Sequence, residues 1–282
     1  MRQHLHFLEV LFCHLLLVFL AGRVGFIIYN RHIEALPLAD IFGACHAGLL
    51  AQDMAVAALF LLPAAVLAFA GSRHPGLPLR ALLAPYYAVA GFCVAAIIVA
   101  DAVMYEFWQF KLSAVVLSYA ASPEGASNSV SHWFIISRVL AAVLLTLWTV
   151  LPCVLLTPRR VPQSPVWRGW MRNMAIVIGA FSAISLATVH VGDSYDESRS
   201  LFRNHAATNP VWAFVSSFPW TSEPARRFNY LGEEERARTF DELYPQDTED
   251  LQDTLLTTRR PNVLVVLIES FGGRFVKELG GL

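Results

Sequence analysis

The chain has 282 residues, of which 56% are hydrophobic and only 15% are charged, and its formal net charge is −1. This composition is too apolar for an ordinary soluble domain and indicates a membrane protein. No basic patch interleaved with aromatic residues occurs in the sequence, so we expect no nucleic-acid partner. The small net charge hides an asymmetry. Residues 1–191 carry 11 Lys/Arg and 7 Asp/Glu, whereas residues 192–282 carry 10 and 15.

Five apolar segments are long enough to cross a bilayer, which requires about 20 helical residues. We expect these spans at 7–29, 47–70, 81–100, 133–156 and 174–191. Aromatic and charged residues follow the third span, and we expect 104–121 to contain a helix end and an amphipathic segment at the membrane surface. Residues 157–172 are basic and Pro-rich and are interpreted as a connector.

Arg23 and Asp53 are two of the four charged residues inside the predicted spans; the other two, Glu9 and Arg138, lie close to span ends. Arg23 is near the far end of the first span, where its long side chain is expected to reach the membrane interface. Asp53 is near the start of the second span. An ionisable residue inside a span is a functional candidate by default, but the closeness of Asp53 to the helix end makes an interfacial position an equally good interpretation.

The distribution of Lys and Arg predicts the orientation. Five spans place the two ends of the chain on opposite sides of the membrane. Most loop arginines fall on the amino-terminal side: Arg2, Arg73, Arg80, Arg159, Arg160, Arg168 and Arg172. The opposite loops offer mainly Arg31, Lys111 and Arg138. By the positive-inside rule the amino terminus is cytoplasmic and everything after Val191 is extracytoplasmic, in a bacterial-type inner or plasma membrane.

The segment after the fifth span is polar. We interpret 192–260 as an extracytoplasmic juxtamembrane linker. It contains a short helix within 204–214 on the membrane surface, and one or two solvated helices or a tethering segment within the acidic stretch 233–254. A different pattern begins at Pro261. The run Val263–Ile268 is apolar and mostly β-branched, and it is followed by Glu269, Ser270 and two glycines.

Such a short apolar run is typical of a strand buried on both faces of a parallel sheet. Ligands of open α/β sheets bind just outside the carboxyl ends of the strands. Glu269 stands at that position and is a candidate metal ligand, although an acid there can also do no more than cap the next helix. Because Leu282 follows so closely, we interpret 261–282 as the start of a truncated catalytic domain.

These features together resemble the lipoteichoic acid synthase family of membrane phosphoglycerol transferases, within the alkaline phosphatase/sulfatase superfamily. The resemblance rests mainly on Asn262–Phe271, with Asn209–Phe214 as weaker support. It implies a fold of five transmembrane helices (1–191) followed by the first strand of an α/β sulfatase-like domain. It also implies that Glu269 binds a divalent metal, commonly Mn²⁺, and that Ser270 caps a helix or supports a ligand. The nucleophilic Thr is expected downstream of Leu282.

The expected function is therefore the membrane anchor of an enzyme that works among membrane lipids on a lipid-linked phosphate donor at the outer leaflet, inactive as this chain alone. A phosphoethanolamine transferase is an alternative, but that family usually has a nucleophilic Thr directly after the Glu, where this chain has Ser270. A non-catalytic membrane scaffold or broken gene product is an alternative of another class. A transporter is disfavoured by the few charges inside the spans and the lack of an inverted repeat.

Overall fold

The computed structural model describes residues 6–74, 76–117, 131–190, 195–196, 199–218 and 232–244. The chain divides into two compact units, Met1–Pro224 and Ala225–Leu282. All described regular elements are helices, and the described part contains no strand. The predicted strand at 263–268, together with Glu269 and Ser270, lies outside the described residues.

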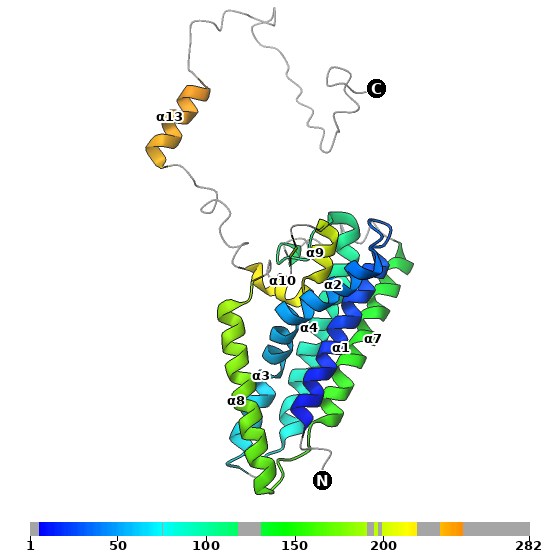
Figure 1. Cartoon of the computed structure of the whole chain (residues 1–282), viewed down its shortest axis with the longest axis vertical. Coiled ribbons are helices and arrows are strands. Elements are labelled where there is room, and N and C mark those ends of the chain that lie inside the picture. The colour runs from blue at the N-terminus through cyan, green and yellow to red at the C-terminus, as the bar shows by residue number, and fades with distance from the viewer. Residues whose placement is uncertain are drawn as a thin grey trace, which may run out of the picture. The chain divides into compact units, whose positions relative to one another are not determined.

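Five helices of the first unit are long and apolar enough to cross a membrane (Figure 1): α1 (Phe7–Tyr29), α3 (Met54–Gly71), α4 (Leu79–Trp108), α7 (His132–Leu156) and α8 (Pro165–Thr188). The sequence-based expectation of five spans is confirmed for the described part of the chain. The lengths and apolar composition of these five helices make the chain a multi-pass membrane protein.

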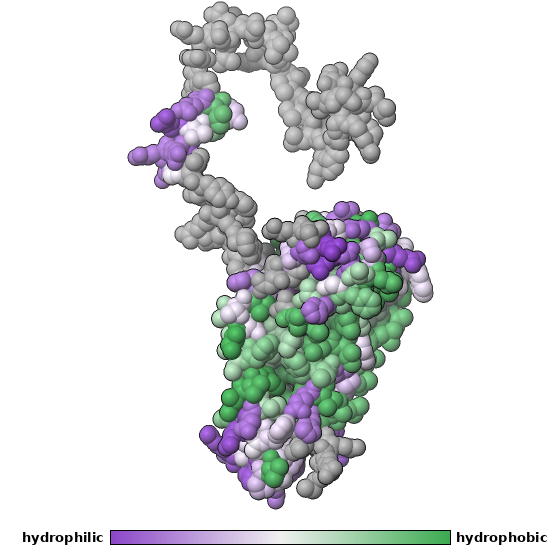
Figure 2. Space-filling view, viewed as in Figure 1, coloured by the Kyte–Doolittle hydropathy of each residue, from purple (hydrophilic) through white to green (hydrophobic). Residues whose placement is uncertain are grey.

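The bundle is arranged around α1, which contacts α3, α4 and α7. α8 packs on α3, and α7 packs on α4. The inner face of α1 is fully buried and includes Leu8, Leu11 and Leu15. α7 instead exposes large apolar side chains such as Leu140 and Leu144. On the face seen in Figure 2, the middle of the bundle is apolar and polar residues lie toward both ends, as a surface surrounded by lipid requires.

Two loops close the end of the bundle near the amino terminus. The backbone of Val161 pairs with Gly76 and Leu77 through two hydrogen bonds of 3.0 Å. Arg80 donates to the carbonyl oxygens of Thr157 and Leu155, both at 2.8 Å. The arginines of these two loops are therefore gathered at one end of the bundle.

Three span boundaries differ from the predicted ones. Helix α4 continues to Trp108, beyond the predicted span end at Ala100, and Gln109, in the left-handed conformation (φ 54°), ends it. The helix end expected in this aromatic segment is confirmed. Helix α8 begins at Pro165 and not at Met174, because Ser164 caps it and Pro occupies its first position. The second span is preceded by helix, since α2 (Leu38–Gly48) continues into α3 through a π-helical turn, η2 (Leu49–Asp53).

The polar segment after α8 folds against the bundle. It forms α9 (Leu201–Ala207) and α10 (Pro210–Ser216), which lie at the end of the bundle away from the amino terminus (Figure 1). Helical structure predicted within 204–214 is thus confirmed, but as two short helices separated by Thr208 and Asn209; its place on a membrane surface stays a prediction. In the second unit, α13 (Glu233–Leu243) buries none of its residues, which confirms the expected solvated helix in that part of the acidic stretch.

Candidate functional site

A cluster of buried polar residues joins α9 and α10 to the ends of the spans. We call this cluster the polar cap. It consists of Arg23, Gln52, Asp53, Asp101, Tyr105, Lys111, His205 and Asn209. Every one of these side chains is wholly or almost wholly buried. Charged groups in such surroundings have to be paired and hydrogen-bonded, because desolvation is otherwise too costly.

The centre of the polar cap is the ion pair between Arg23 and Asp53. The guanidinium donates two hydrogen bonds to the carboxylate, at 2.6 and 2.8 Å. It also donates to the carbonyl oxygens of Ala206 at 2.9 Å and Ala207 at 3.3 Å, at the end of α9. The Arg23 side chain is thus buried inside the protein and bound to Asp53 in a bidentate pair, instead of lying on the bundle surface.

The π-helical turn explains how two consecutive residues both face inward. Gln52 and Asp53 end η2, and neither has any exposed surface. Single π-helical turns inside longer helices are rare and often mark functional positions. The carboxylate of Asp53 accepts from the side-chain amide of Asn209 at 2.8 Å, while the side-chain oxygen of Gln52 accepts from the backbone N–H of Asn209 at 2.6 Å. Asp53 is therefore buried inside the protein and not exposed at the bundle surface.

Asn209 links the ion pair to α10. Its side-chain oxygen accepts from the backbone N–H groups of Val211 at 2.9 Å and Trp212 at 3.1 Å, which makes it the N-cap of the helix. Pro210 occupies the first helical position, where the missing N–H costs nothing. The Asn-Pro pair in the sequence thus signals the helix start, but not the contact with Asp53.

Gly48 allows this close packing. A Cβ atom at position 48 would overlap both a guanidinium nitrogen of Arg23 and the carbonyl oxygen of Ala207. Both atoms lie much closer to the position of that Cβ atom than van der Waals contact allows. A glycine at the end of α2 is therefore what lets the arginine reach the carbonyl groups of α9.

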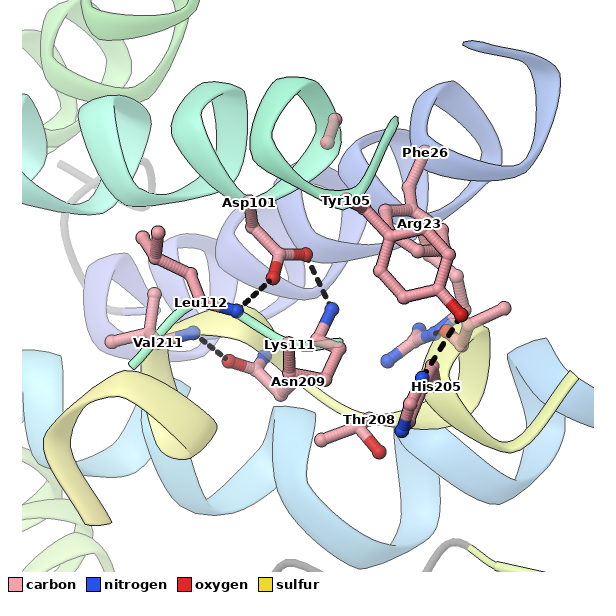
Figure 3. Close-up of polar contacts among 12 residues, drawn as sticks. Arg23, Phe26, Asp101, Tyr105, Lys111, Leu112, His205, Thr208, Asn209 and Val211 are labelled. Carbon is pink, nitrogen blue, oxygen red and sulfur yellow. Dashed lines mark hydrogen bonds and ion pairs between the residues drawn. The ribbon is translucent and has the colours of Figure 1, made fainter. Parts of the chain in front are cut away.

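A second ion pair lies beside the first (Figure 3). The ammonium of Lys111 donates to the carboxylate of Asp101, whose other oxygen accepts from the backbone N–H of Leu112 at 2.9 Å. The Lys111 ammonium also lies 4.5 Å from the ring centre of Phe26. Burial lowers the pKa of Lys111, and the carboxylate of Asp101 opposes that effect. Lys111 was expected at a loop surface; the turn after Gln109 returns it to the bundle.

His205 completes the polar cap from α9. Its Nδ1 lies 2.9 Å from the Tyr105 hydroxyl. Burial lowers the pKa of His205 to about 4, and the nearby Lys111 ammonium adds to the effect, while Asp101 opposes it. His205 is therefore neutral at neutral pH.

We expect acid to destabilise the fold through His205. Because its folded-state pKa lies below the unfolded value of 6.5, its contribution is present above pH 6.5 and is lost as the pH falls from 6.5 toward 4. The loss is about 3 kcal/mol, from about 1.4 kcal/mol per pKa unit. Thermal unfolding in detergent at pH 7.5 and 4.5 measures it. His205→Gln should flatten the pH dependence, and His132→Gln, at an exposed position, should leave it unchanged. Equal slopes in all three proteins would contradict the assignment.

The polar cap joins the ends of α1 and η2 to α9 and the start of α10. Among the described residues, no group of three or more His, Cys, Asp or Glu side chains could hold a metal ion. Of the sequence-predicted site residues, the structure describes Asp53, which it buries in the cap. Glu269 and Ser270, the predicted metal ligand and its neighbour, lie outside the described residues.

No protein-family model matches the chain, and neither a curated protein nor a solved structure matches it.

Proposed function

We propose that the chain is the membrane anchor and the start of the catalytic domain of a metal-dependent phosphoglycerol-transferase-like enzyme that acts on lipid-linked phosphate at the outer leaflet. One structural observation supports this proposal most. α9 and α10 are locked to one end of a five-span bundle by a buried bidentate ion pair. An enzyme that works on lipid headgroups has to be held at the leaflet that contains them.

The sequence supplies the chemical part of the proposal. The run Asn262–Phe271 resembles the first strand and metal-binding end of the lipoteichoic acid synthase family. Glu269 would be one ligand of a divalent metal such as Mn²⁺, and Ser270 would cap a helix or support a ligand. Bound metal would neutralise phosphate charge and help to activate a hydroxyl nucleophile. In that family the nucleophile is a Thr further along the chain, beyond the position matched by Leu282.

The arginine distribution supports the orientation. The loops that contain Arg73, Arg80, Arg159 and Arg160 lie at the end opposite α9 and α10. By the positive-inside rule that end is cytoplasmic. α9, α10 and the catalytic segment would then lie on the outer side, next to the headgroups of the outer leaflet.

The test is an assay of the open reading frame that contains this chain. We expect the coding DNA to continue with a Thr and an Asp/His cluster. The whole product in liposomes should then release diacylglycerol from fluorescent phosphatidylglycerol when Mn²⁺ is present. Glu269→Gln should reduce that rate by more than the about 10- to 100-fold that loss of a residue supporting a metal ligand costs. Glu278→Gln is the matched control and should retain the rate.

Other outcomes would redirect or reject the proposal. Release from phosphatidylethanolamine alone, together with a covalent adduct that Ser270→Ala abolishes, would favour a phosphoethanolamine transferase. A stop codon without a following frame would reject it and favour the membrane scaffold. Lipid release that needs no Mn²⁺ and is unchanged by Glu269→Gln would reject the metal-dependent mechanism.

A further inference from the structure

A groove between α1, α4 and α7 opens on the side of the bundle. Its volume is about 380 Å³. Small residues from all three helices form its floor, among them Gly22, Gly25, Ala102 and Ala141. At Gly25 a Cβ atom would meet nothing within 4 Å, so this part of the floor faces open space. The groove thus leaves room for a narrow apolar chain between the helices.

The groove runs along the bundle axis. On α1 its lining extends from Ala21 to Tyr29, and on α7 from Ser137 to Leu145. Eight helical residues rise about 12 Å. One leaflet of a bilayer has a hydrocarbon depth of about 15 Å, half of the total. The groove therefore has nearly the length of an acyl chain within a single leaflet.

Arg138 is the one charged residue in the described lining of this groove. It lies on α7 about 9 Å along the axis from the start of the helix at His132. Its guanidinium donates to the hydroxyl groups of Tyr29 at 2.6 Å and Ser137 at 2.8 Å. It also lies 4.2 Å from the ring centre of Phe134, one turn earlier on the same helix. These contacts fix the position of the cation.

The charge of Arg138 has no direct counterion in the described part of the chain, where no carboxylate lies within 4 Å of its guanidinium. The nearest acidic contact is indirect, because the Tyr29 hydroxyl donates its own hydrogen bond to Glu106 at 2.7 Å. Glu106 does not line the groove. An arginine inside a span is costly without an anionic partner, and the planar guanidinium fork matches phosphate geometry.

We propose that this groove binds an anionic phospholipid from the leaflet next to α9 and α10. The lipid phosphate accepts hydrogen bonds from Arg138, and one acyl chain lies along the small residues of α1, α4 and α7. The apolar groove binds the acyl chain, and Arg138 selects lipids with an anionic headgroup. The inference does not depend on the proposed enzymatic activity, because none of its residues belongs to the predicted catalytic segment.

The test is lipid titration of the purified full chain in a non-ionic detergent, followed by native mass spectrometry. Phosphatidylglycerol is compared with phosphatidylcholine, and inorganic phosphate serves as a competitor. We expect one phosphatidylglycerol to bind more tightly than phosphatidylcholine. Arg138→Gln should weaken phosphatidylglycerol binding about tenfold, as the loss of a charged hydrogen bond does, and should remove the preference between the lipids.

A second variant tests the apolar half of the site. Gly25→Leu should weaken both lipids by a similar factor, because its side chain fills the groove. Arg73→Gln, an exposed arginine over Phe69, and Gly179→Leu, at a position with nothing within 4 Å, are the matched controls and should bind like the wild type. Thermal unfolding checks that each variant is folded. If Arg138→Gln fails this check, Arg138→Lys replaces it and should retain part of the preference.

Three results would overturn the proposal. Equal binding of the two lipids by the wild type would show that the groove does not select an anionic headgroup. Unchanged binding by both Arg138→Gln and Gly25→Leu would place any bound lipid elsewhere. Release of the lipid by millimolar inorganic phosphate would show that the cation binds free phosphate instead of a lipid.

Discussion

Replacing Arg23 with methionine is expected to lower the free energy of unfolding by about 3–5 kcal/mol, the range for breaking a buried ion pair. The substitution leaves the Asp53 carboxylate buried without its cation, and it leaves two carbonyl groups of α9 without their donor. Thermal unfolding in detergent, followed by circular dichroism, measures the loss. Arg31→Met is the control, since Arg31 is exposed near the same end of the bundle, and it should change stability by less than about 0.5 kcal/mol.

The double variant Arg23→Met/Asp53→Met separates the ion pair from the rest of the cluster. Removing both charges abolishes the cost of an unpaired buried ion. We therefore expect the double variant to lose clearly less stability than the sum of the two single variants. Additive losses would mean that the two residues contribute independently, which the bidentate geometry does not allow.

Replacing Asp101 with leucine is the second substitution with a large expected effect, again about 3–5 kcal/mol. Lys111 would then be buried without its carboxylate, and the backbone N–H of Leu112 would lose its acceptor. The loss is measured in the same detergent unfolding experiment.

Asp40→Leu provides the matched control for that experiment. Asp40 pairs with Arg199 at 3.3 Å, but the arginine side chain is 52% exposed. Exposed pairs contribute at most about 1 kcal/mol. If Asp40→Leu and Asp101→Leu lower the free energy of unfolding equally, burial is not the cause of the effect at Asp101.

Hydropathy alone was enough to predict the five spans, because their apolar runs are long and are separated by charged or Pro-rich loops. The boundaries were less predictable. Trp167, Arg168 and Arg172 lower the hydropathy at the start of α8, and they concealed a helix that Ser164 and Pro165 already signalled. On α4, the aromatic residues before Trp108 indicated a helix end, and the helix ends there, eight residues beyond the predicted span end at Ala100.

The contacts of the polar cap could not be predicted from the sequence, for a physical reason. Arg23 and Asp53 meet because of how α1 is rotated and because η2 turns two consecutive side chains inward. Lys111 meets Asp101 because the left-handed Gln109 reverses the chain. Neither feature has a periodic signature. Opposite charges near the same end of neighbouring spans were the one indication in the sequence. They suggest that ion pairs form, but not which residues pair with each other.

The most direct test of the anchor and its orientation is a pair of reporter fusions after Leu282, one with β-lactamase and one with green fluorescent protein, expressed in bacterial cells. β-Lactamase protects single cells from ampicillin only when it is exported, whereas green fluorescent protein exported in unfolded form does not fluoresce. Five spans with a cytoplasmic amino terminus predict ampicillin resistance and no fluorescence. Fluorescent, ampicillin-sensitive cells would contradict the account, because the polar segment and Glu269 would then lie on the cytoplasmic side.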